Sequence, residues 1–145
     1  MAKPIKNGKI TFPYGAKYSD GGVHKGVDFA VPQGTPVYAA VAGTVVHSGT
    51  HLSGGWSNRG WGTAFGVHIV IDNNKFADGT PGLWSCYGHM SKVVVALGDK
   101  VKKGQLIGYT GNTGNSTGPH LHFQVNDKRY WDATAHHNPD RWLKA

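Results

Sequence analysis

The chain has 145 residues, of which 22 are glycine, 16% are charged and 11% are aromatic. This length suits one domain with a sizeable core, and the composition excludes a disordered or largely helical protein and favours a β protein rich in turns. The formal net charge of +7 favours anionic partners. Because the lysines and arginines are scattered, we do not expect nucleic acid among those partners.

Signals for export and membrane insertion are the next features to look for. The N-terminus carries positive charge without an apolar run behind it, so we expect no signal peptide. No stretch approaches the roughly 20 apolar residues that a membrane-spanning helix needs. Cys86 is the single cysteine and cannot form an internal disulfide. We expect a protein that does not insert into a membrane, and we expect it to be a monomer.

The first stretch with candidate functional residues follows an irregular N-terminal segment, residues 1–13. Apolar side chains alternate with others from Val27 to Val31, which predicts a strand. Side chains four apart in an extended chain share a face, so His24 and Asp28 should point the same way. Taken alone, this pair is equally consistent with two ordinary surface side chains.

A long loop is predicted after two short strands in residues 37–46. The loop, residues 47–66, is rich in glycine and contains Trp56 and Trp61. Loops of this length without regular structure usually carry function. The two tryptophans either line a substrate groove or cover the underside of their own loop, and the sequence leaves both possibilities open.

Two further strands carry isolated histidines. Residues 67–72 predict a strand in which His68 is most simply a structural or exposed side chain. The next strand begins at Leu83 and should end at Gly88, which would place His89 near a strand end. That position suits a functional group, although an isolated histidine is more often incidental.

The glycine-rich stretch of residues 111–119 leads into the strand with the clearest pattern. His120 and His122 are two residues apart, so both should project from one face while Leu121 packs on the other. Two parallel imidazoles can both bind a metal ion, or one can bind while the other acts as a base.

The spacing of the turns predicts the fold class. Turn signals recur at intervals of about eight to twelve residues. We therefore expect a mainly β protein with little helix: an antiparallel β-sandwich of short strands, with an open groove between long loops. Residues 1–145 should form a single domain, and residues 126–145 should be an irregular tail whose Trp142 and Leu143 pack back on the body.

Three histidine motifs occur in one order along the chain. They are His24-x-x-x-Asp28, Tyr87-Gly-His89-Met-Ser91 and Ser116-Thr-Gly-Pro-His120-Leu-His122-Phe123. With linking phrases such as Gly98-Asp99-Lys-Val101, these motifs resemble the lysostaphin and LytM-type zinc metalloendopeptidases, which cut peptidoglycan peptides. The resemblance extends over residues 14–143. It departs from the family pattern in the loop at 47–66 and in an insertion at 72–83.

The resemblance implies roles for individual residues. It implies one zinc ion and a catalytic histidine pair: His24, Asp28 and His122 as ligands, and His89 and His120 as the pair. Two histidines and one carboxylate leave an open position, as catalytic zinc sites require. Tyr18 would correspond to a family tyrosine near the oxyanion. With Trp56 and Trp61, it is a candidate substrate-binding residue.

These roles predict a zinc-dependent, bacteriolytic endopeptidase. It would hydrolyse cross-bridge or stem-peptide bonds in bacterial peptidoglycan, and the basic surface suits an anionic cell wall. Without a signal peptide, it would stay in the host cytoplasm before release, as a phage endolysin does, or it would be a catalytic domain excised from a larger enzyme.

A catalytically silent wall-binding or amidase-activating module of the same fold is the alternative, although all five polar positions are intact here. A lipoyl- or biotin-carrier-like domain would need a Met-Lys pair at a hairpin tip, which the chain lacks. A lectin-like protein would leave the histidines unexplained.

Overall fold

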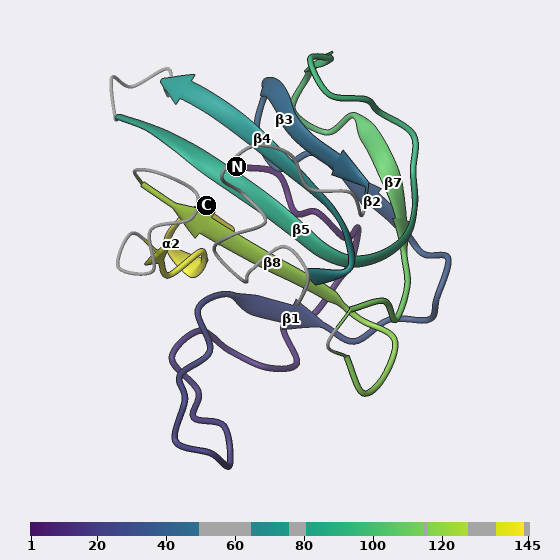
Figure 1. Ribbon diagram of the computed structural model, residues 1–145. Coiled ribbons are helices and arrows are strands. Elements are labelled where there is room, and N and C mark those ends of the chain that lie inside the picture. The colour runs from purple at the N-terminus through teal and green to yellow at the C-terminus, as the bar shows by residue number, and fades with distance from the viewer. Residues whose placement is uncertain (50–64, 76–80, 115, 128–135, 144–145) are drawn as a thin grey trace.

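Antiparallel strands make up nearly all the regular structure of the chain (Figure 1). The computed structural model describes residues 1–49, 65–75, 81–114, 116–127 and 136–143. The elements are β1 (Val27–Phe29), β2 (Pro36–Tyr38), β3 (Gly43–Gly49), β4 (Val67–Lys75), β5 (Pro81–Val93), β6 (Lys100–Val101), β7 (Leu106–Thr110), β8 (Leu121–Asn126), β9 (His136–His137) and the short helix α2 (Asp140–Leu143). The prediction of a mainly β, antiparallel fold with little helix is confirmed. Among the described residues, no helix has the length and apolar character to cross a membrane.

The strands join one sheet whose order is β1-β8-β5-β4-β3-β6. β9 extends the sheet beside β8, and β2 joins it through β7. β5 pairs with β4 along one edge and has two successive neighbours along the other: Trp84–Gly88 pair with β8, whereas Met90–Val93 pair with β7. The sheet therefore forks at His89. The prediction that this strand ends at Gly88 is wrong, because the strand continues to Val93.

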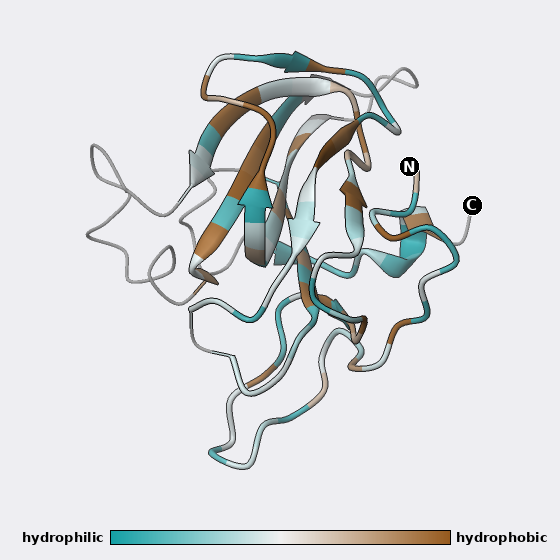
Figure 2. Ribbon diagram, turned by 90° about the vertical axis from the view of Figure 1, so that its right-hand side faces the viewer, coloured by the Kyte–Doolittle hydropathy of each residue, from teal (hydrophilic) through white to brown (hydrophobic). Residues whose placement is uncertain are grey.

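The core follows from alternation along the central strands. Ile69 and Ile71 of β4, with Leu121 and Phe123 of β8, have no exposed surface. Figure 2 shows hydrophobic segments recurring along these strands. Tyr87 is also fully buried, and its hydroxyl is satisfied by Ala40 N at 2.9 Å and Ser85 Oγ at 3.0 Å. The buried hydroxyl of Tyr87 therefore has hydrogen-bond partners, as buried polar groups in folded proteins generally do.

Both ends of the described chain contribute to the core. Ile5 is 2% exposed although it lies in the irregular N-terminal segment, and Leu143 of α2 is 5% exposed. Trp142 packs against the same cluster. Between these ends, the segment before β1 projects away from the sheet as a loop (Figure 1), closed by a bridge between Lys17 and Val23.

Strand β3 extends into the stretch that the sequence predicted to be a loop. His47, Ser48 and Gly49 belong to β3, because they pair with β4. Trp56 and Trp61 lie outside the described residues. His68 is fully buried and stacks on His47, with 4.0 Å between the ring centroids. It therefore serves as a structural side chain within the sheet.

Candidate metal centre

Three side chains from distant parts of the chain converge on one point. His24 Nε2 lies 3.2 Å from Asp28 Oδ1, and His122 Nδ1 lies 3.0 Å from the same oxygen. The two imidazole nitrogens are 3.1 Å apart. Asp28 and His122 are direct cross-strand partners in the β1–β8 register. Among the described residues, these three form the group whose donor atoms could share a metal ion.

The triangle has the size that a tetrahedral zinc site requires. Zinc lies about 2.0–2.1 Å from imidazole nitrogen and about 2.0–2.2 Å from carboxylate oxygen, which places two tetrahedral donors about 3.3 Å apart. The three observed separations fall between 3.0 and 3.2 Å. The residues present therefore fit zinc without rearrangement of the sheet.

The outer nitrogens of both histidines orient the inner ones. His24 Nδ1 donates to the carbonyl of Pro13 at 3.0 Å, and His122 Nε2 donates to Gln124 Oε1 at 2.9 Å. Each outer nitrogen thus carries a hydrogen, and the inner nitrogen of each ring faces Asp28. Histidine ligands in metal sites are commonly fixed by such partners.

Gly26 lets β1 lie close enough to β8 for this arrangement. A Cβ at this position would lie 2.4 Å from the carbonyl oxygen of Phe123 and 2.9 Å from the His122 ring. Both distances are shorter than real contacts allow. The glycine in the His24–Asp28 motif is therefore a steric requirement of the site.

The carboxylate at the centre of the group remains ionised. Burial alone would raise the pKa of Asp28, but hydrogen bonds from His122 and His24 outweigh burial and hold the pKa well below its ordinary value. A negative charge within a pair of imidazoles suits a divalent cation.

Two more histidines flank the triangle. The rings of His89 and His120 lie 4.6 Å apart, and His120 Nε2 is 3.9 Å from Asp28 Oδ1. His120 and His122 therefore point to the same face, as predicted, since both rings face Asp28 Oδ1. His89 Nδ1 donates to Thr113 O at 2.7 Å, and His120 Nδ1 donates to Gly118 O at 2.8 Å. Each ring of the pair thus keeps Nε2 as its acceptor.

A bulge in β5 aims His89 into the site. His89 has φ of 60°, a left-handed conformation uncommon outside glycine. Gly88 and His89 together oppose one residue of β4, because Met90 pairs with Val67 and Tyr87 with Ile69. Bulges re-aim side chains beside active sites. Burial lowers the pKa of His89 to about 4, so its ring is neutral at pH 7.

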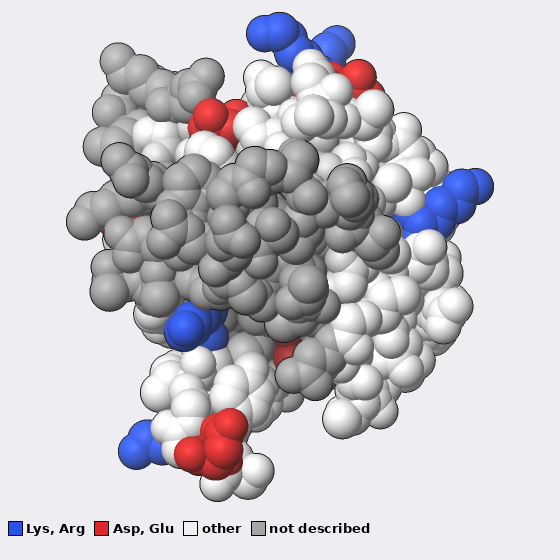
Figure 3. Space-filling model, in the orientation of Figure 1, with Lys and Arg blue, Asp and Glu red and all other residues white. Residues whose placement is uncertain are grey.

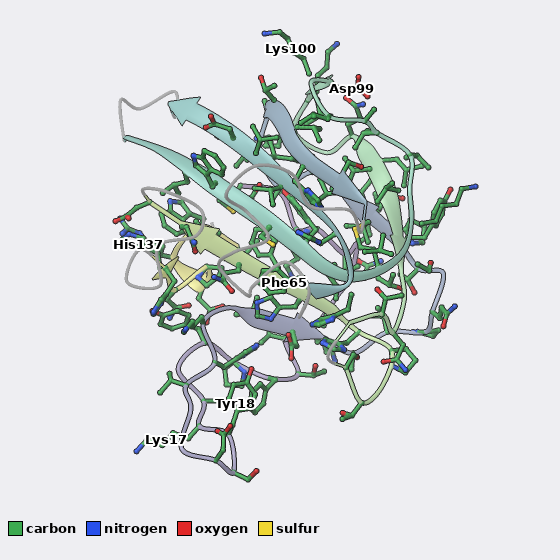
Figure 4. All side chains as sticks on the ribbon, viewed as in Figure 1. Lys17, Tyr18, Phe65, Asp99, Lys100 and His137 are labelled. Carbon is green, nitrogen blue, oxygen red and sulfur yellow. The ribbon has the colours of Figure 1, made fainter. Side chains whose placement is uncertain are left out.

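Aromatic side chains line the group. Phe65 stacks on His122 with centroids 5.4 Å apart, and Phe12 lies 4.6 Å from the His24 ring. Tyr18 meets His24 edge-on at 5.8 Å and is 46% exposed. Figure 4 shows Phe65 and Tyr18 on either side of β1. Burial, and then the charges of Asp28 and Asp20, raise the pKa of Tyr18, so its hydroxyl stays protonated.

The sequence did not single out three residues that matter here. Gln124 could have been found from its position, because it follows His122 by two residues and shares its strand face. Phe65 and Thr113 gave no such signal, since their roles depend on contacts between distant segments. Figure 3 shows the described lysines and arginines spread around this face without forming a patch, as the sequence predicted.

The chain was compared with known proteins. Residues 22–135 match the model of peptidase family M23. Lysostaphin of Staphylococcus simulans is 44% identical over 126 residues, which cover 87% of this chain and 22% of lysostaphin. Its solved catalytic domain superimposes with a TM-score of 0.74 at 36% identity, covering 97% of this chain and 95% of that domain. The glycyl-glycine endopeptidase ALE-1 of Staphylococcus capitis is 42% identical over 87% of this chain and 30% of its own length.

A third relative names the metal. A zinc-containing peptidase from Vibrio cholerae superimposes with a TM-score of 0.67 at 34% identity, covering 85% of this chain and 35% of that one. The zinc prediction is confirmed, because M23 enzymes are zinc metallopeptidases and the described residues include a matching donor group. The chain spans less than a third of the length of the curated relatives named above. The chain belongs to peptidase family M23.

Proposed function

We propose that this chain is a zinc-dependent endopeptidase that hydrolyses peptide bonds in the peptide part of bacterial peptidoglycan and thereby lyses cell walls. The observation that carries the proposal is the triangle of His24, Asp28 and His122, with two further histidines beside it. The names of the relatives support the substrate class: lysostaphin is called an antimicrobial peptidase, and ALE-1 a glycyl-glycine endopeptidase.

The three ligand residues and the histidine pair have separate tasks in this proposal. His24, Asp28 and His122 would hold zinc, which when bound would act as a Lewis acid and lower the pKa of water to about 7. His89 and His120 each present an Nε2 lone pair. One of these rings accepts the proton of the attacking water and later delivers it to the leaving amine. Until it delivers this proton, the imidazolium formed in that step would stabilise the developing oxyanion. The other ring would accept a hydrogen bond from the water through its own Nε2.

Tyr18 has a supporting role in this proposal. Its ring borders His24 and its protonated hydroxyl can donate to a substrate carbonyl. The exposed edge of the ring leaves it accessible to a peptide that approaches the site. Trp56 and Trp61 remain candidates for the groove wall.

We also propose that the chain meets its substrate as a monomer, without nucleic acid and without entering a membrane. The described basic side chains are scattered over the face shown in Figure 3, which supports the absence of nucleic acid from this proposal. Size-exclusion chromatography with light scattering tests it, and a dimer mass at working concentration would contradict it.

Digestion of purified cell walls tests the enzymatic function. Walls with glycine cross-bridges and walls with direct cross-links should be incubated with the zinc-loaded chain, and the new amino termini mapped by mass spectrometry. We expect termini from one type of peptide bond, loss of cleavage with a chelator, and recovery with added zinc. Absence of new termini from every wall tested would refute the proposal.

A further inference from the structure

One threonine ties the loop of residues 111–119 to two strands of the sheet. Thr113 Oγ1 donates to the carbonyl of Met90 on β5 at 2.6 Å. The same oxygen accepts from the backbone amide of Val67 on β4 at 3.1 Å. A single hydroxyl thus bridges β4 and β5 at one end of the bulge that contains His89, where Val67 pairs with Met90.

The carbonyl of the same threonine is the partner of His89. His89 Nδ1 lies 2.7 Å from Thr113 O. A carbonyl oxygen can only accept, so this contact keeps the hydrogen of His89 on Nδ1. The loop backbone therefore fixes both the tautomer and the ring orientation of His89, with Nε2 left as acceptor.

The backbone of this loop packs closely on Gly66, the residue that precedes β4. A Cβ built on Gly66 would lie 2.4 Å from the Gly114 amide nitrogen and 2.5 Å from the Thr113 carbonyl carbon. Backbone is packed on backbone at this point. The two hydrogen bonds of the Thr113 hydroxyl then hold this backbone so that the Thr113 carbonyl faces His89.

His89 needs this support more than a residue in regular strand would. Its left-handed backbone, with φ of 60°, lies where β5 leaves β8 and joins β7. Strained backbone persists only where surrounding contacts hold it in place. In this conformation the His89 ring lies 4.6 Å from the His120 ring, measured between centroids.

We propose that Thr113 is a positioning residue: its hydroxyl holds the carbonyl that orients His89 for proton transfer. This inference rests on the proposed function, because it assigns His89 to the catalytic pair. Thr113 itself touches neither the ligand triangle nor the reacting atoms.

Two substitutions at this position separate the hydroxyl from the rest of the side chain. Thr113→Val keeps the shape and removes both hydrogen bonds, whereas Thr113→Ser keeps the hydroxyl. We expect Thr113→Val to lower the maximal rate of wall hydrolysis roughly 10- to 100-fold, as misplacement of a catalytic group does. The wall concentration for half-maximal rate and the zinc content should stay within twofold, and Thr113→Ser should recover most of the rate.

Matched controls keep loss of stability apart from loss of positioning. Ser48→Ala removes another hydroxyl-to-carbonyl bond, from Ser48 Oγ to Val95 O at 2.7 Å, and should leave the rate unchanged. Gly66→Ala leaves the Thr113 side chain unchanged, but it displaces the loop and strains its own left-handed backbone (φ 65°), and it should reproduce the loss caused by Thr113→Val. It also provides the test if Thr113→Val does not fold.

Histidine ¹⁵N NMR at pH 7.5 tests the positioning without activity. Wild-type His89 should show the Nδ1–H tautomer, and Thr113→Val or Gly66→Ala should show a tautomer mixture. A wild-type Nε2–H tautomer, a folded Thr113→Val variant with a rate within twofold of wild type, or a Thr113→Ser variant as slow as Thr113→Val would overturn the inference. If the wild type cleaves no wall, the proposed function fails, while the NMR result still decides whether Thr113 orients His89.

Discussion

Gln124 should determine how tightly His122 holds zinc. Gln124 Oε1 accepts from His122 Nε2 at 2.9 Å, and Gln124 Nε2 in turn donates to Asn126 Oδ1 at 3.1 Å. Gln124 is 3% exposed, so water cannot take over the role of acceptor. The hydrogen bonds from His122 to Gln124 and from Gln124 to Asn126 thus fix the hydrogen of His122 on Nε2, the nitrogen that faces away from Asp28.

Gln124→Met keeps the length of the side chain and replaces the acceptor with a weakly accepting thioether. Loss of such a partner typically costs 10- to 100-fold in metal affinity, or about 1.4 to 2.7 kcal/mol. Burying an unpaired N–H acts in the same direction. Gln124→Glu keeps an acceptor for His122 Nε2 but loses the donor to Asn126 Oδ1, so it should bind zinc more tightly than Gln124→Met.

Competition with a metal-sensitive dye at pH 7.5 measures the zinc dissociation constant directly. Gln33→Met is the control, because Gln33 lies exposed in the turn before β2 and should leave the affinity unchanged. A dissociation constant for Gln124→Met within twofold of the wild type would refute the reasoning, as would a loss of equal size in Gln33→Met.

Three further predictions concern the histidines. His122→Ala should abolish zinc binding, which elemental analysis would show; retention of one zinc per chain would exclude His122 as a ligand. His120→Ala should retain zinc and lose roughly a hundredfold in wall hydrolysis, since one charge stabiliser is removed; unchanged turnover would exclude it from catalysis. Burial, and then His47, lower the pKa of His68 from 6.5 to about 3. As the pH falls, His68 is therefore protonated in the unfolded chain before it is protonated in the folded protein. The free energy of unfolding of the zinc-free protein should fall as the pH drops from 6.5 toward 3, by up to about 1.4 kcal/mol per pH unit. Urea unfolding of the wild type and His68→Gln checks this, and equal slopes would contradict it.

Local pattern was enough to predict the fold class and the shared face of His120 and His122. Alternation of side chains along a strand is a property of a few consecutive residues, and it held in β8. The prediction that the strand ends at Gly88 was wrong because of the backbone conformation of the next residue, His89. Glycine is a common signal of interruption, but here His89 takes the left-handed backbone and the strand continues through a bulge.

The ligand triangle was predicted from the resemblance alone, because no local pattern links its members. Asp28 and His122 meet across a register between strands that are 94 residues apart in the chain. Pairing between strands so far apart in the chain depends on which strands bury their apolar faces together. The periodicity of the sequence does not show which strands will pair. The anchoring of His89 by Thr113 has the same origin, since the bond joins two segments at a fork in the sheet.

The short edge strand β1 has a consequence for the order in which the molecule comes apart. It has three residues, pairs with β8 on one side and carries Asp28, while His24 precedes it. An ion bound by both Asp28 and His122 would link β1 to β8 and close a loop of 94 residues. Cross-links that close long loops restrict the unfolded chain most. Chelation should therefore loosen the first thirty residues before the central strands, and a protease should cut the metal-free protein there first.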